Sequence, residues 1–399
     1  MSTNRLIYSV LLCHFVAAMA ALGMPLFLPY VLPQLEAEVS LEWAGILFVL
    51  PTLCTALAAR FWGRFADRFG RRLSLLRAQL GLALGFWLCG SATSLETLML
   101  GLIIQGTFGG AMAASNSYLA SQIDSAPLLS KTLNKTQLSA RLALVVAPIS
   151  LSMILIYQSA LEAYLYLALL PCLAFTLTLS LPKDQPSLSP KHAPKIKLTS
   201  QTPPKAKLFF IQFLFAFSMV LTFPYFAVFS QMRGLQDTFW ISVLYALPHL
   251  MYLLLAGYAH RVIWSYQKTL LLGLSGLAIT YFMHLIPSLS ILVLARITFG
   301  ISMVLCFHGL HIGLSHNLDR QHSGRIFATF DAMSKWGGVV AGSIAALFAH
   351  YELIPPLFLV AGCSVLLAGL SLFITAPHTV CTEQPARLNR LRCTIKGLK

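Results

Sequence analysis

Charged side chains are scarce in this sequence. Of the 399 residues, 10% are Asp, Glu, Lys or Arg, and only 13 are acidic. Soluble domains carry about 25% charged residues. Hydrophobic residues make up 57% of the chain. A chain with so few charges cannot cover its surface with groups that water solvates well, so a soluble globular protein is excluded.

The sequence also lacks the short motifs of common enzyme sites. It has no phosphate-binding Gly-Lys-Ser/Thr loop, no HExxH and no GxSxG nucleophile turn. Its eight cysteines form no CxxC pair. His308 and His311 are three residues apart, but the sequence suggests no third ligand. We therefore expect no enzyme activity, no cofactor, no metal site and no ATP-driven chemistry.

Long apolar runs dominate instead. About twelve runs of some 20 residues, the length that crosses a bilayer core, can be counted, and strand-like alternation is absent. The first lacks a signal-peptide cleavage site, so we expect it to be retained. Because backbone groups in lipid must be paired within the segment, we predict an all-α membrane protein with twelve transmembrane helices. They cover residues 7–30, 43–62, 73–93, 98–119, 137–158, 163–181, 207–230, 238–258, 268–286, 290–312, 326–349 and 355–375.

Basic residues concentrate on one side of these predicted helices. If the N-terminus is cytoplasmic, most of the 28 Lys and Arg residues fall in cytoplasmic segments, and one, Arg233, falls in an external loop. Lys and Arg set the orientation of membrane proteins. We therefore expect a multi-pass protein of the bacterial inner membrane with both termini in the cytoplasm. The net charge of +15 then requires no nucleic-acid partner.

A proline- and lysine-rich segment, residues 182–206, divides the chain. We predict an N-terminal six-helix bundle (1–181), this cytoplasmic linker, a C-terminal six-helix bundle (207–375) and a basic cytoplasmic tail (376–399). The two halves repeat each other weakly, since a shift of 194 residues aligns two VVA segments and brings Arg141 onto Lys335. Duplicated halves are typical of transporters, whose substrate site lies where the halves meet.

The segment GRFADRFGRR resembles the loop motif of the major facilitator superfamily between its second and third helices. The matching residues are Gly63, Asp67, Arg68, Gly70, Arg71 and Arg72. The resemblance covers essentially the whole chain and implies two pseudo-symmetric six-helix bundles. It also implies that the segment, which we expect to form a tight cytoplasmic turn, is a gate. In this gate, Asp67 and the basic residues join the cytoplasmic ends of the halves in the outward-open state.

Within the superfamily, segments such as ALGMPLFLPYVLPQL and GAMAASNSYLASQ resemble the exporters of carboxylate siderophores, of the vibrioferrin and legiobactin type. This resemblance implies export of a small iron chelator. Drug exporters usually carry an arginine in helix 4, and that position is Leu102 here. The corresponding position in the second half is Arg296. The glycines typical of helix 5 in drug exporters are also missing.

Charged residues inside the predicted helices mark the candidate substrate site, because a charge in mid-bilayer is costly. Arg141 and Lys335 each follow a basic residue by ten positions, which places both roughly 15 Å into their helices. Two such cations can bind an acidic substrate, since arginine holds carboxylates through two hydrogen bonds. The alternative is a structural role, in which both are tied to backbone carbonyls or partner helices. The other predicted substrate-binding residues are Arg296, Gln137, Gln105 and Asn116.

Asp331 and Lys335 are four residues apart and can meet on one helix face. One hypothesis is that protonation of Asp331 releases Lys335 for substrate and so couples protons to export. The alternative is a static salt bridge. His14 and His249 titrate near neutrality and are further proton-coupling candidates.

Helix 4 carries Gln105, Gly109, Met112 and Asn116 at helical spacing. Such a stripe can line a cavity or allow close helix packing.

Together, these features predict a monomeric secondary exporter of a small anionic substrate, in the lipid bilayer and coupled to protons. A multidrug proton antiporter, an importer of a carboxylate or ferric siderophore, and a non-transporting sensor or scaffold remain as alternatives. The scaffold alternative predicts an apolar interior with Arg141 and Lys335 paired internally.

Overall fold

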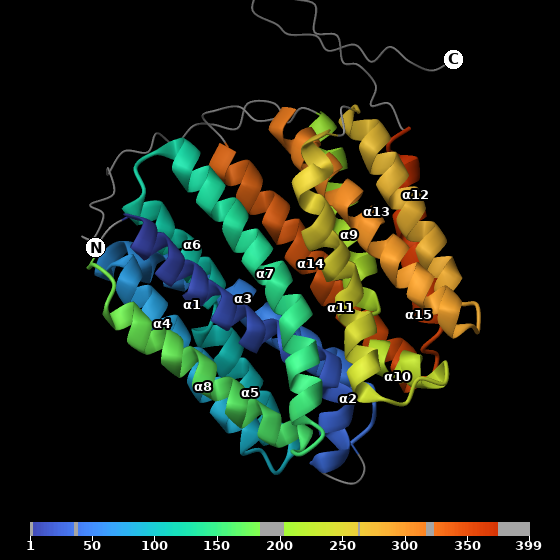
Figure 1. Cartoon of the computed structure of the whole chain (residues 1–399), viewed down its shortest axis with the longest axis horizontal. Helices are drawn as coiled ribbons and strands as arrows, with labels where there is room; N and C mark the ends of the chain where they lie inside the picture. The colour runs from blue at the N-terminus through green and yellow to red at the C-terminus, as the bar shows by residue number, and fades with distance from the viewer. Residues whose placement is uncertain (1–2, 36–38, 184–202, 262–263, 317–322, 374–399) are drawn as a thin grey trace, which may run out of the picture.

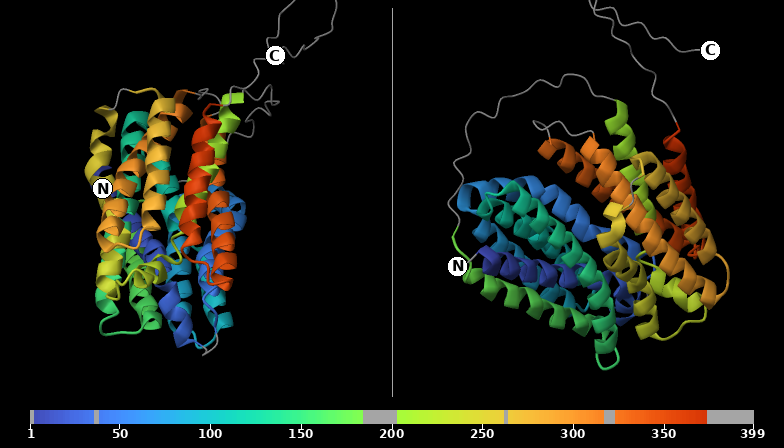
Figure 2. Two further views of the ribbon diagram at one scale, coloured as in Figure 1. Left: turned by 90° about the vertical axis from the view of Figure 1, so that its right-hand side faces the viewer. Right: turned by 45° about the horizontal axis from the view of Figure 1, so that its top comes forward.

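The computed structural model describes residues 3–35, 39–183, 203–261, 264–316 and 323–373, and within these ranges all regular structure is helical. Figure 1 shows the helices side by side, and the left view of Figure 2 shows that they run along one common direction. Most of the predicted linker and the predicted tail (376–399) lie outside the described residues.

The first half of the chain supplies the helices of six predicted spans. Its elements are α1 (Thr3–Gly23) with the short η1 (Met24–Phe27), α2 (Leu28–Val31) and η2 (Leu32–Gln34), then α3 (Trp43–Phe69), α4 (Arg71–Gly90), α5 (Leu95–Phe108), α6 (Ala111–Gln122), α7 (Ala126–Ile154) and α8 (Ala160–Leu179). The second half supplies α9 (Pro203–Leu221), α10 (Phe226–Met232), α11 (Thr238–Leu255) with η3 (Ala256–Arg261), α12 (Tyr266–His284), α13 (Leu289–His316), α14 (Ser323–His350) and α15 (Pro356–Ser371).

All twelve predicted apolar runs are helical. In the described part of the chain, nine helices are long and apolar enough to cross a membrane, and the bent pair α9 and α10 makes a tenth. The other two runs correspond to α12 and α15, which pack against each other. Helix α15 has 16 residues and is shorter than a typical span of about 20 residues. The chain is therefore a multi-pass membrane protein.

Side chains cap both ends of these helices. Ser159 and Glu162 form a reciprocal capping box at the start of α8, and Ser94, Ser125, Asp237 and Ser265 accept from backbone N–H groups at other helix starts. At C-terminal ends, Arg72 donates to the Thr178 carbonyl of α8 and Arg233 donates to the His284 carbonyl of α12. These contacts pair groups that a helix end leaves without partners.

Two predicted boundaries differ from the structure. Helix α3 continues to Phe69, so the reversal before α4 is made by Gly70 alone, at φ 99°. Only glycine takes such an angle at no steric cost, which is why the GRFADRFGRR segment is helical on both sides of Gly70 and the predicted tight turn is confined to that residue. Helix α7 begins at Ala126, eleven residues before its apolar run (126 against 137). Apolar runs mark contact with lipid, whereas a helix continues through polar residues until its cap.

Two predicted helices are interrupted. The run 98–119 divides into α5 and α6 at Gly109 and Gly110, the latter at φ 82°. The run 207–230 divides into α9 and α10, which are bent by 53° around Pro224. Proline has no N–H to donate and clashes with the preceding turn, so a helix seldom continues through it unchanged.

The two halves meet along two seams, where α7 packs on α11 and α3 packs on α14. We call the end that carries Leu179 and Pro203 the linker end and the opposite end the distal end. The second seam is closest at Gly45 of α3 and Gly342 of α14. A Cβ at Gly45 would lie 2.8 Å from the Gly342 carbonyl oxygen, and a Cβ at Gly342 would lie 2.1 Å from Val49 Cγ1. Both positions therefore require glycine for this approach.

Candidate functional site

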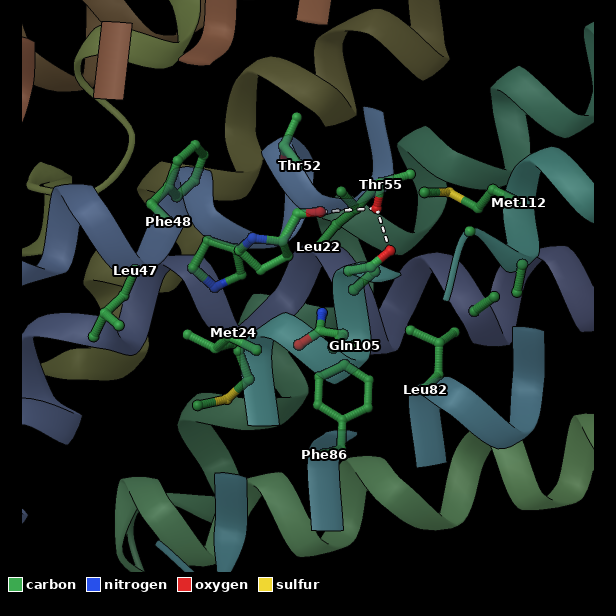
Figure 3. A pocket seen from close by; sticks show the side chains of 18 of the residues that line it. Leu22, Met24, Leu47, Phe48, Thr52, Thr55, Leu82, Phe86, Gln105 and Met112 are labelled. Carbon is green, nitrogen blue, oxygen red and sulfur yellow. Dashed lines mark hydrogen bonds between the residues drawn. The ribbon is translucent and has the colours of Figure 1, made fainter. Parts of the chain in front are cut away.

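The first cavity lies mostly among the helices of the N-terminal half and measures about 260 Å³. Its walls come from the α1–α2 region, α3, α4, α5, α6 and α8, and Lys335 of α14 lines it from the other half; Figure 3 shows most of the lining side chains. Most lining residues are apolar, among them Met24, Phe48, Leu82, Phe86 and Met112. The break between α5 and α6 belongs to this wall, since Gly110 and Ala111 line the cavity. Such a wall suits an uncharged part of a small molecule.

A second cavity of about 220 Å³ lies between the halves. It is lined from the first half by residues such as Val49 and Leu144 and from the second by residues such as Tyr245 and Ser334. The two cavities share five lining residues: Leu22, Pro25, Phe48, Thr52 and Lys335. They are therefore adjacent parts of one interior space.

Lys335 is the single charged residue among the described residues that line these two cavities. It lies near the middle of α14, and its Nζ atom is 2.8 Å from Asp331 Oδ2. Asp331 lines neither cavity and its side chain is 65% exposed, while the Lys335 side chain is 41% exposed. The lysine side chain is therefore only partly buried, while its ammonium is paired to an exposed acid. This arrangement fits either predicted role for the pair.

Arg141 is half-buried at the seam between α7 and α11. Its guanidinium lies over the rings of Tyr252 and Phe307, at 5.0 and 4.7 Å from their centroids, and Nη1 is 3.4 Å from His249 Nδ1. Arg141 is thus bound to the opposite half of the chain. It lines neither cavity, but Leu144, one turn along α7, lines the second.

The predicted proton-coupling histidines have different partners. His249 is buried and, when neutral, can accept a hydrogen bond from Arg141 at Nδ1. A protonated His249 would place two cations in contact across the seam. His14 is buried between α1 and α7, with Nδ1 3.3 Å from Ser139 Oγ. Neither histidine lines the two cavities, and their coupling roles stay predictions.

Arg296 is buried against α11, away from both cavities. Its Nε and Nη2 atoms donate to the carbonyls of Leu244 and Tyr245, at 2.9 and 3.0 Å. Pro248 lies four residues after Leu244 and has no N–H to offer that carbonyl. Arg296 replaces the missing donor. These contacts with backbone carbonyls are of the kind that the sequence analysis gave as the alternative for Arg141 and Lys335, and substrate binding by Arg296 stays a prediction.

The polar stripe predicted for the run 98–119 is divided between α5 and α6 by the break at Gly109 and Gly110. Gln105 and Met112 line the first cavity, whereas Gly109 and Asn116 line neither. Gln137 is exposed on α7 and also lines neither. The structure therefore brings Gln105 and Lys335 to one interior space and leaves the other predicted polar residues outside it.

Arg77 of α4 supports the cavity wall, and the sequence did not indicate this role. It donates to the carbonyls of Phe108 and Gly109, which the break between α5 and α6 leaves without helical donors. Its guanidinium stacks on the Trp62 ring, 3.7 Å from the ring centroid. The glycine pair was the available signal for this break. Arg77 thereby supports the cavity wall from α4.

The GRFADRFGRR segment lies at the linker end of the first half. Asp67, in the last turn of α3, is 3.7 Å from Arg71 Nη2, and its side chain is 53% exposed. Arg68 lies over Phe69, and Arg72 caps α8. Gly63 has no atom within 4 Å of an added Cβ. These residues lie apart from both cavities, so the gate stays a prediction.

Replacing Asp67 with Asn is expected to slow transport several-fold while leaving substrate affinity nearly unchanged, because Asp67 lines neither cavity. Equilibrium binding and flux into vesicles, measured on the same preparation, check this. Asp124→Asn, at another exposed acid of the first half, is the matched control. A large loss of binding in Asp67→Asn would contradict the gate.

A cluster at the distal end, also missed from the sequence, joins the halves. The buried Tyr225 hydroxyl accepts from the Gly45 N–H and donates to the Glu42 carbonyl, both at 2.9 Å. His350 of α14 contacts the Glu42 carboxylate. We call Glu42, Gly45, Tyr225 and His350 the distal latch. Its members come from three distant parts of the sequence, and only Pro224 signalled the bend that positions Tyr225.

A sequence model of the Major Facilitator Superfamily matches residues 10–266, more than half of the chain. Multidrug resistance protein MdtG of Proteus mirabilis is 36% identical over 114 residues, and that of Escherichia coli K12 is 36% identical over 123 residues. These matches cover 28% and 30% of each chain, so the chain spans less than a third of the length of these relatives.

Solved structures share the fold at low sequence identity. A POT family transporter in complex with 5-aminolevulinic acid has a TM-score of 0.77 and 12% identity, covering 92% of this chain and 95% of its own. The human organic anion transporter MFSD10 has a TM-score of 0.70 and 14% identity, covering 93% and 100%. Among the described residues, no three His, Cys, Asp or Glu side chains are grouped to hold a metal ion. The family match and the helical architecture together show that the chain belongs to the Major Facilitator Superfamily.

Proposed function

We propose that the chain is a secondary exporter that binds a small organic anion at Lys335 and moves it across the bacterial inner membrane by alternating access. The observation that carries this proposal is the position of Lys335, a cation near the middle of α14 that lines both cavities. A charge at this depth is costly unless it has a function or a partner. Asp331 compensates it only in part, because that acid is mostly exposed.

A carboxylate siderophore is the substrate we propose within this class. The resemblance of the N-terminal segments to siderophore exporters supports it, and so does a second cation nearby. Arg141 is one helical turn from Leu144, which lines the cavity between the halves. A substrate with several carboxylates can contact Lys335 first and recruit Arg141 as the halves move, since Arg141 is held by aromatic faces and a histidine rather than by an acid.

Proton coupling is proposed at Asp331. Protonation of this acid would remove the charge that holds Lys335 Nζ at 2.8 Å and release the ammonium for substrate. The high exposure of Asp331 supports access by protons from the linker end. In a sensor or scaffold, both cations would be paired and sequestered, whereas 41% of the Lys335 side chain is exposed.

Deleting the gene should stop secretion of the chelator by iron-starved cells. We expect the chelator in the medium to fall to near background and to return when the gene is supplied on a plasmid. Assay of the medium for iron-binding activity checks this, with growth in iron-replete medium as the control. Normal secretion in the deletion strain would overturn the siderophore proposal.

A multidrug exporter is the second candidate. The apolar wall of the first cavity and the MdtG relatives, named as multidrug resistance proteins, favour it. A panel of drug susceptibilities on the same deletion strain separates the two. Increased drug sensitivity with normal chelator secretion would replace the first candidate by the second.

A further inference from the structure

We infer that the transported anion carries an uncharged segment with an N–H or O–H donor, and that Gln105 accepts a hydrogen bond from this donor while Lys335 holds the anionic group. The inference rests on the proposed function, because it assumes that Lys335 binds the anion. It adds the chemical class of the rest of the substrate.

The position of the two groups supports this division. Gln105 lies on α5 and lines the cavity within the first half, whereas Lys335 lies on α14 and lines both cavities. Each cavity is smaller than the roughly 300 to 1,000 Å³ of a typical small-molecule site. A ligand anchored at Lys335 therefore fills the site only by extending past the shared residues into the first half.

The Gln105 side chain is nine-tenths buried, and its Oε1 atom has no hydrogen-bond partner in the described part of the chain. Figure 3 shows its amide among cavity residues, with Phe86 and Met24 close by. One hydroxyl of this wall is already used, because Thr55 donates to the carbonyls of Pro51 and Gly106. A buried acceptor without a donor is costly, and a ligand donor would remove that cost.

The Gln105 oxygen disfavours a second carboxylate beside it. Oε1 repels a carboxylate, and the Met, Leu and Phe side chains of this wall offer it no donors. An amide N–H or a hydroxyl suits the position, flanked by carbon atoms that contact the apolar wall. The substrate class is therefore an organic anion with an amide- or hydroxyl-bearing apolar segment.

Matched ligands test this directly. The purified full-length chain in nanodiscs is titrated calorimetrically with 6-acetamidohexanoate and 6-acetoxyhexanoate, which differ in an amide N–H against an ester oxygen. The four- and eight-carbon pairs vary the distance from the carboxylate. At one length or more, we expect the amide to bind roughly three- to tenfold more tightly than the ester, as one neutral hydrogen bond allows.

Variants assign the effect to its residues. Gln105→Leu should remove the preference for the amide and keep ester affinity, which also reports that the variant is folded. Gln212→Leu is the matched control, because its Oε1 is likewise buried without a hydrogen-bond partner in the described part of the chain but the residue lines neither cavity. Lys335→Gln should weaken the amide and the ester equally.

Three results would overturn the inference: no binding by any pair, equal affinity of amide and ester at every length, or a preference that survives Gln105→Leu. If Lys335→Gln weakens both ligands while the amide and ester bind equally, the inference fails and the proposed function stands. If Lys335→Gln changes neither affinity, the proposed function fails, and the inference that rests on it fails with it.

Discussion

Replacing Lys335 with Gln is expected to lower anion affinity and secretion at least tenfold, with the amount of protein in the membrane unchanged. Lys335 is the single charged residue in the described lining of the cavities, so no other lining residue can replace its interaction with an anion. A hydrogen bond to a charged group contributes about 1.5 to 3 kcal/mol, which corresponds to a tenfold or larger change in binding. Secretion by cells and equilibrium binding to purified protein measure the two quantities.

Two further variants make this result specific. Lys335→Arg keeps the charge and should retain most of the affinity, whereas Lys268→Gln removes an exposed lysine of the same half that lines neither cavity. Asp331→Asn should preserve binding but remove the response of transport to a pH gradient, since it releases Lys335 permanently. Unchanged pH-driven transport in Asp331→Asn would leave the Asp331–Lys335 pair as a static salt bridge. Full secretion in Lys335→Gln would contradict the proposed function.

Replacing Gly45 with Ala is expected to open the distal end and to abolish most transport. The added Cβ would lie 2.8 Å from both the Gly342 carbonyl oxygen and the Tyr225 hydroxyl, closer than packed atoms approach. Helices α3 and α14 must then separate, and Tyr225 loses its hydrogen bonds to the Gly45 N–H and the Glu42 carbonyl within the distal latch. The equilibrium between conformations shifts toward states in which the distal end is open, because only the closed state contains this contact.

Spin-label distances between positions 40 and 351, on opposite halves at the distal end, measure this shift in a cysteine-free background. We expect a longer mean distance in Gly45→Ala. Gly63→Ala on the same helix is the matched control, since a Cβ there meets nothing within 4 Å. Tyr225→Phe should give a smaller shift, because it removes two hydrogen bonds without a clash. An unchanged distance in Gly45→Ala would show that the distal latch does not control the opening.

Several elements of the site could be read from residue order because their cause is local. The apolar runs correspond to helices, and the spacing of Asp331 and Lys335 correctly placed them in contact on one face of α14. The repeat correctly placed Arg141 and Lys335 near the middle of corresponding helices. It did not predict their different surroundings, because those come from α11 and α13 for Arg141 and from the cavities for Lys335.

The sequence by itself determined that this protein is a helical membrane protein, because long apolar runs without strand alternation can pair their backbone groups in lipid only as helices. Only the tertiary structure decided which buried cation is available to a ligand. Arg296 is held by the carbonyl that Pro248 leaves without a donor, whereas Lys335 faces the interior space. A charge inside a bilayer is costly for either residue, and Arg296 is 3% exposed whereas the Lys335 side chain is 41% exposed. What separates their roles is the set of partners that neighbouring helices bring to each, and that set is a property of packing rather than of residue order.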